Sequence, residues 1–167
     1  MDVTFNGTAS FGGGGTFMGT RAKVTFADTF SFGGILNTGV DSGNEIVISS
    51  NKNTSNATEF GGKGTVTLDG GGAVYGMSAN NDNFSGTFSV KEGLLNLLGN
   101  ASLSKATVDI ANTGSALVTL GTLDGNKTII GNLVGDGKVD LGASENTMSL
   151  LGAASVATAS TEGALIE

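Results

Sequence analysis

The sequence predicts an all-β fold, a right-handed parallel β-helix (β-solenoid) with about 21 residues per coil. Pairs of apolar residues separated by one residue recur along the chain at steps of 20 to 22 residues. The 167 residues include 29 glycines and no proline, which suits short strands that pair on both sides and turn at glycine corners. A fixed period near 20 residues is typical of a solenoid, whereas helical repeats are longer.

The main row of apolar pairs predicts one strand in every coil. Its members are Val3/Phe5, Val24/Phe26, Ile46/Ile48, Val66/Leu68, Phe88/Val90, Val108/Ile110 and finally Ile129, with Gly131 in the second place. Most residues between the two members of a pair are polar, which is the period-two pattern of a strand. We therefore expect the pairs to point inward and to stack at about 4.8 Å per coil.

A second row predicts another strand in the C-terminal half. It consists of Leu95/Leu97, Val118/Leu120 and Val139/Leu141, and Phe11 to Phe32 is a weaker trace of a third row. The leucines of segment 88–100 also fit helical spacing. The register of the second row favours a strand, because the stretch between Gly93 and Gly99 is too short for a stable helix.

The chain is expected to form one β-helix segment over residues 1–152. Coils within 1–82 carry a weaker pattern and coils within 83–152 are regular, while 153–167 is expected to be a linker, a cap or a frayed tail. Loops that project from corners are predicted at 36–45, 50–60 and 75–82, with Phe60 and Tyr75 near them.

The composition excludes several classes of function. The net charge is −7 and the eight basic residues form no cluster, so no nucleic acid is expected as a partner. The chain has no cysteine and no histidine, which excludes disulfides, thiol nucleophiles, Ser-His-Asp triads and metal sites built on Cys or His. No signal peptide precedes the strand-like DVTF that follows Met1. We expect the chain to be a fragment of a longer protein.

Carboxylates are the remaining candidates for catalysis, as in β-helices that cleave polysaccharides. The candidates are Asp69, Asp109, Asp136 and Asp140, whose expected neighbours in the stack are Ser, Thr, Asn or Ala and not further acids. We interpret them as a solvated outer face and expect no enzyme activity. The stretch 135–142 resembles half of a calcium-binding nonapeptide that occurs only once, and 60–65 lacks the spacing of a phosphate loop. No cofactor or metal is therefore expected.

Residues 83–97, NFSGTFSVKEGLLNL, resemble the passenger-associated repeat of autotransporters, the type V secretion proteins. The matching positions are Asn83, Phe84, Ser85, Gly86, Thr87, Phe88, Val90, Gly93, Leu95 and Leu97. The resemblance extends over about residues 80–142, and residues 1–79 share the period but carry a weaker motif.

This resemblance implies a right-handed parallel β-helix in a passenger domain at the outer surface of a Gram-negative bacterium. Such passengers are exported through a membrane barrel of the same polypeptide, and many act in adhesion, aggregation or virulence. Two alternatives stay open, an autochaperone region that promotes passenger folding and a carboxylate-dependent polysaccharide-processing β-helix. A host protein or glycan, or a second passenger, is the expected partner, and segments 36–45 and 50–60 are expected to carry the contact.

Overall fold

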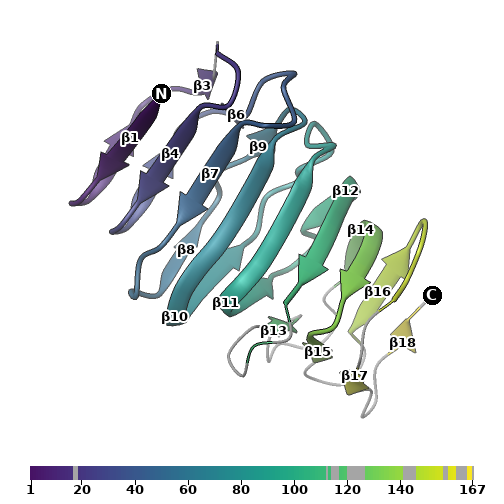
Figure 1. The fold of residues 1–167 in the computed structure, drawn as a ribbon. Coiled ribbons are helices and arrows are strands. Elements are labelled where there is room, and N and C mark those ends of the chain that lie inside the picture. The colour runs from purple at the N-terminus through teal and green to yellow at the C-terminus, as the bar shows by residue number, and fades with distance from the viewer. Residues whose placement is uncertain are drawn as a thin grey trace.

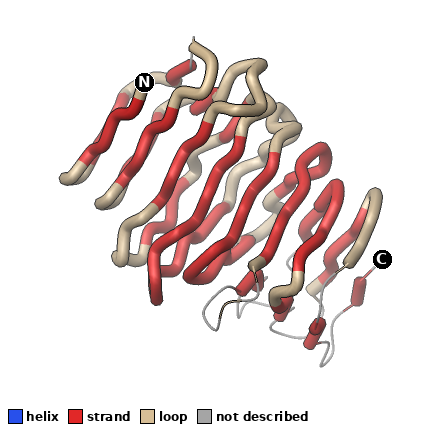
Figure 2. The backbone as a smooth tube through the Cα atoms, in the orientation of Figure 1, coloured by secondary structure: helices blue, strands red, loops and turns tan. Residues whose placement is uncertain are grey.

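The chain folds as a parallel β-solenoid of about six turns in the computed structural model shown in Figure 1. The structure describes residues 1–16, 19–111, 113, 117–119, 127–140, 146–155, 158–160 and 165–166. Every regular element in these ranges is a strand (Figure 2), and strands about 21 residues apart pair in parallel. The predicted all-β class, the parallel stacking and the repeat length are confirmed.

One 13-stranded sheet runs through the molecule and two small sheets cover the N-terminal corners. The path of the large sheet is β1 (Asp2–Phe5), β4 (Lys23–Phe26), β7 (Glu45–Ile48), β10 (Thr65–Met77), β11 (Thr87–Leu97), β12 (Ser102–Ile110), β14 (Lys127–Gly135), β16 (Thr147–Leu150) and β18 (Leu165–Ile166). Its side branches are β8 (Thr54–Asn56), β13 (Leu117–Thr119), β15 (Lys138–Asp140) and β17 (Thr158–Ser160). The small sheets are β2 (Ala9–Phe11) with β5 (Phe30–Phe32), and β3 (Gly15–Thr16), β6 (Leu36–Asn37) and β9 (Phe60–Gly61).

The main apolar row lies in the predicted register over its first six strands. Its successive partners are Val3, Val24, Ile46, Val66, Phe88 and Val108. The last four of these side chains are fully buried. Each strand therefore buries its apolar face only by stacking on the coils before and after it.

The next step of that row differs from the prediction, because Val108 pairs with Leu133 and not with Ile129. Ile129 is 40% exposed, whereas Leu133 is fully buried. The first half of β14 pairs with the start of β12, and the register shifts before its second half pairs with the end of β12. Gly131 lies at this shift, where a Cβ atom would approach the carbonyl oxygen of Ala106 to 2.6 Å. A kink of this kind lengthens one coil, and a constant period cannot reveal it.

The second apolar row is confirmed where the structure describes it. Leu95, Val118 and Val139 are successive partners in register and all three are buried. The leucine-rich stretch therefore forms part of a strand, β11, as the row predicts. The outer members of the row, Leu120 and Leu141, lie outside the described residues.

The segments 36–45, 50–60 and 75–82 are only in part the loops that the sequence predicts, because β6, β8 and the end of β10 lie within them. Some of their polar side chains are exposed, as at Ser42 and Asn51, whereas others are buried, and Asn44 is only 1% exposed. Its Oδ1 atom accepts a hydrogen bond of 2.8 Å from the backbone amide of Ala22. The polar composition of these corners therefore reflects side chains that satisfy buried backbone groups.

An aromatic cluster fills the N-terminal half of the core. Phe60 and Tyr75, predicted to lie near irregular loops, are 0% and 1% exposed. Phe30 stacks on Tyr75 with ring centroids 5.9 Å apart. Phe11 pairs in register with Phe32, as predicted, and their rings stack at 4.7 Å. The coils within 1–82 therefore share an aromatic core that runs from one coil to the next.

Two short strands lie within the C-terminal segment 153–167. Strand β17 pairs with β15, and β18 pairs with β16. Both pairings are parallel and continue the stacking direction of the coils before them.

Candidate functional site

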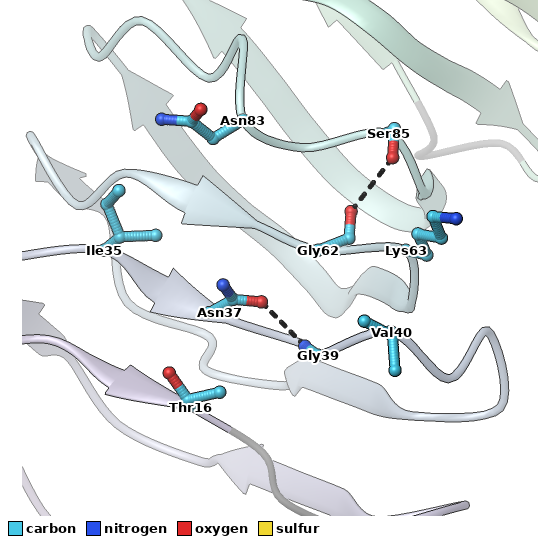
Figure 3. A pocket seen from close by; sticks show the side chains of 9 residues that line it. All are labelled: Thr16, Ile35, Asn37, Gly39, Val40, Gly62, Lys63, Asn83 and Ser85. Atoms are coloured by element: carbon cyan, nitrogen blue, oxygen red, sulfur yellow. Dashed lines mark hydrogen bonds between the residues drawn. The ribbon is translucent and has the colours of Figure 1, made fainter.

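A groove of about 560 Å³ follows the corner formed by β3, β6 and β9 (Figure 3). Its lining residues are Thr16, Ile35, Asn37, Gly39, Val40, Gly62, Lys63, Asn83 and Ser85. These residues come from four successive turns of the solenoid. The groove therefore runs parallel to the axis along which the coils stack.

The groove follows a row of outward-facing positions. Thr16 pairs in register with Asn37, and Asn37 pairs with Gly61. The bridge between Gly62 and Phe84 places Asn83 next in the same row. Two amides and a hydroxyl thus occur at successive coil steps, with a glycine between the amides.

That glycine, Gly61, interrupts the row of polar side chains, and its surroundings leave no room for a side chain. A Cβ atom added to it would lie 2.9 Å from Cγ2 of Ile35 and 3.4 Å from Cγ of Asn37. The neighbouring Gly62 has a φ of +88°, and a Cβ atom there would lie 2.5 Å from the carbonyl oxygen of Gly39. The absence of a side chain at Gly62, which lines the groove, lets the backbone of the third turn form its floor.

The backbone amides around the groove are already engaged within the fold. Gly39 donates to Oδ1 of Asn37 at 2.8 Å, and Lys63 donates to the carbonyl oxygen of Gly39 at 2.9 Å. Gly62 donates to the carbonyl oxygen of Asn83 at 3.1 Å, and Ser85 donates to that of Gly62 at 2.9 Å. Recognition of a ligand in this groove therefore falls to side chains.

Several side chains in the groove keep free hydrogen-bonding capacity. Among the described residues, the Asn83 amide and the Lys63 ammonium have no hydrogen-bond or ion-pair partner. The hydroxyl of Ser85 reaches the carbonyl oxygen of Gly62 only at 3.5 Å. Lys63 carries the one charge among the lining residues, and Val40 is 88% exposed at the rim. The groove thus combines neutral polar groups, one cation and an apolar rim.

Only part of this groove lies where the sequence predicts contact. Segment 36–45 contributes Asn37, Gly39 and Val40, and segment 50–60 contributes no lining residue. Sequence reasoning missed Lys63 and Asn83. The signal that marks the site is the alignment of polar outward positions one coil apart, interrupted by Gly61, and it becomes visible only once the register is known.

The candidate carboxylates are dispersed, with one exception. Asp136 lies in an exposed turn, and the neighbours of Asp109 in register are Ser89 and Val134. Asp69 departs from the expectation, because the register shift in β10 pairs it with Glu92 and not with a neutral residue. Both of these carboxylates are exposed. Among the described residues, no three acidic side chains gather into a group that could hold a metal ion.

Three other carboxylates connect one coil to the next. Hydrogen bonds from the hydroxyls of Ser102 and Ser104, 2.6 and 2.5 Å long, lower the pKa of Asp82. A 2.6 Å ion pair with Lys52 lowers the pKa of Asp28. These contacts join residues 20 to 24 positions apart in the sequence and stabilise the stack locally.

Glu45 is the third of these carboxylates. Burial raises its pKa, but hydrogen bonds from Thr67 and Lys23 outweigh burial and leave the pKa below its ordinary value. The ion pair between Glu45 and Lys23 measures 3.1 Å. Lys23 and Glu45 are partners in the register of β4 and β7, so this contact also joins adjacent coils.

No helix long and apolar enough to cross a membrane occurs in the part of the chain that the structure describes. Comparisons with family models, with curated proteins and with solved structures find no match for this chain.

Proposed function

We propose that this chain is a β-solenoid segment of an autotransporter passenger at the surface of a Gram-negative bacterium, where it supports adhesion or aggregation. In this role the stacked coils form a scaffold that holds contact surfaces away from the membrane barrel of the same polypeptide. The chemistry of the segment is recognition and not catalysis.

The observation that carries this proposal is the structural role of the motif in residues 83–97. Phe84 is fully buried, and Gly86 is so close to the carbonyl oxygen of Gly64 that no Cβ atom fits there. Gly93 has a φ of +88° and turns the chain within β11. These three motif positions thus have a physical reason within a coil, which supports the resemblance to the passenger-associated repeat.

The mode of stacking supports a scaffold role. Along the path of the large sheet, each strand pairs with strands of the coils directly before and after it. Solenoids of this kind have a stability that is a sum of coil terms and nearest-neighbour interfaces. Because each coil contacts only its neighbours, coils can be added without changing the local structure. This property suits a surface spacer.

A second candidate function, as an autochaperone, is favoured by the pairing of β10 with β11. These two strands are the longest in the described chain, and they pair over both sides of the coil from Thr65↔Thr87 to Met77↔Leu97. An extensive local interface gives newly exported coils a template on which to stack.

The scaffold proposal is tested by placing the chain between a signal peptide and an autotransporter barrel in a Gram-negative host. We expect the chain to appear on intact cells as a folded, protease-resistant segment, detected by surface labelling and limited proteolysis. Retention in the periplasm, or display in a form that protease degrades completely, would contradict the proposal. For the autochaperone role, a reporter passenger is placed upstream, and deletion of this segment should leave the reporter displayed but protease-sensitive.

A further inference from the structure

We propose that the groove along β3, β6 and β9 binds a linear oligosaccharide that carries carboxylate groups and lies along the solenoid axis. This inference deepens the surface-contact role proposed above and rests on it for the setting in which such a glycan is available. It names a ligand class and the side chains that would recognise it.

The dimensions of the groove suit an elongated ligand. Its volume of about 560 Å³ falls within the range of small-molecule sites. Thr16 and Asn83 are separated by three coil steps, which correspond to about 14 Å at the spacing of adjacent strands. A chain of a few sugar rings matches this length when it lies parallel to the axis.

A peptide ligand is disfavoured because the backbone amides of the groove are already hydrogen-bonded. Extended peptides gain affinity by pairing with free main-chain groups at a sheet edge. In this groove the amides of Gly39, Gly62, Lys63 and Ser85 are used by the fold itself. A peptide would find only side chains here, and its own amides would lose water without compensation.

The free polar side chains match the chemistry of sugar hydroxyls. An amide both donates and accepts hydrogen bonds, as does a hydroxyl, and Asn83 and Thr16 present one of each along the groove. The apolar side chains of Ile35 and Val40 flank these groups and can pack against the C–H face of a sugar ring.

Lys63 selects for carboxylates. It is the one charged residue in the lining, and no acidic side chain among the lining residues neutralises it. Charge-assisted hydrogen bonds are roughly twice as strong as neutral ones. A sugar acid therefore binds here better than a neutral sugar of the same shape, although the whole chain carries a net charge of −7.

Isothermal titration calorimetry with two probes tests this inference. One probe is a tetrasaccharide of galacturonic acid, and the other is the same tetrasaccharide with its carboxyl groups reduced to hydroxymethyl groups. We expect the acidic probe to bind more tightly. Lys63→Gln should weaken its binding at least about tenfold, the equivalent of one charge-assisted hydrogen bond, and should leave the neutral probe unaffected.

The matched control is Lys127→Gln, which removes the same charge from an exposed position outside the groove at the start of β14. It should leave binding of the acidic probe unchanged. A second variant, Asn83→Ala, removes the free amide of the fourth turn and should weaken binding of both probes. The Asn83 amide has no side-chain partner among the described residues, so the fold should persist, which circular dichroism checks.

The proposal is overturned if neither probe binds at millimolar concentration, if both probes bind equally, or if the two lysine variants lose affinity equally. Binding of both probes that is unchanged by Asn83→Ala in a folded protein also overturns it. These measurements use the purified chain and are independent of export. Surface display with no glycan binding would therefore reject the ligand and leave the scaffold proposal standing.

Discussion

The carboxylate of Asp82 accepts a 2.6 Å hydrogen bond from the hydroxyl of Ser102, 20 residues further along the chain. Ser104 donates a second hydrogen bond to the same carboxylate oxygen. The contact joins the corner after β10 to the start of β12 and is one of the few charged connections between coils. It makes part of the stability depend on the ionisation of Asp82.

Asp82→Asn should lower the free energy of unfolding at pH 7 by about 1 kcal/mol, because both hydroxyls then donate to a neutral acceptor and the site is partly solvated. The pKa of Asp82 is lowered in the folded state, so its contribution is fully present above its ordinary pKa of 3.8 and is lost as the pH falls through the folded value. Urea unfolding at pH 7 and at pH 3 checks this. A difference between wild type and variant that is as large at pH 3 as at pH 7 would contradict it.

Val108→Asp should destabilise the protein by more than about 3 kcal/mol, because it places a charge between the buried side chains of Phe88 and Leu133. Asp109→Asn on the adjacent outward position should change stability by less than about 0.5 kcal/mol.

A change to aspartate at Ile129 distinguishes the observed register from the register that a constant period predicts. Ile129 is 40% exposed, so Ile129→Asp should cost far less than Val108→Asp in chemical denaturation. Equal costs for the two variants would mean that Ile129, and not Leu133, continues the buried row.

Phe60→Ala should lower the free energy of unfolding by about 3–5 kcal/mol, because it opens a cavity in the aromatic cluster. Phe60 is fully buried and contacts the rings of Tyr75, Phe84 and Phe88. Phe11→Ala removes the same side chain from a 39% exposed position and should cost much less. Thermal and urea unfolding compare the two, and a similar loss in both would show that Phe60 does not lie in a packed core.

Gly62→Ala should destabilise the third coil by more than about 1 kcal/mol. The φ of +88° is unfavourable for alanine, and the new methyl group would meet the Gly39 carbonyl at 2.5 Å and Oδ1 of Asn37 at 2.6 Å. Gly7→Ala is the matched control, since no atom lies within 4 Å of its added Cβ. If both variants unfold at the same urea concentration, the backbone geometry at Gly62 is wrong.

Periodicity predicted the strands whose apolar residues stack on apolar residues one coil away. Val24, Ile46 and Val66 lie where the spacing places them, because burial leaves each strand a single register. The corners were not predictable in the same way. Thr38 is fully buried because its hydroxyl donates to the carbonyl oxygen of Gly61 and accepts from the amide of Gly64. Composition alone makes such a residue look like part of a solvated loop.

The groove could not be predicted from the sequence, for a related reason. It depends on which outward residues become neighbours, and Asn37 and Asn83 are separated by two coils of unequal length. Only the register brings them into one row. Gly61 is also one glycine among 29, so nothing in its local sequence distinguishes a break in a row of polar side chains from an ordinary corner.

The ladders of hydrogen bonds between coils run parallel to the solenoid axis, and this direction determines how the protein responds to mechanical force. Tension applied along the axis loads the interface between adjacent coils and can peel the terminal coil away while the rest stays folded. Each released coil of about 21 residues adds about 70 Å of extended chain. A tether built in this way would lengthen in even steps under flow and dissipate load, and the coils left intact would offer an edge on which the released coils could stack again.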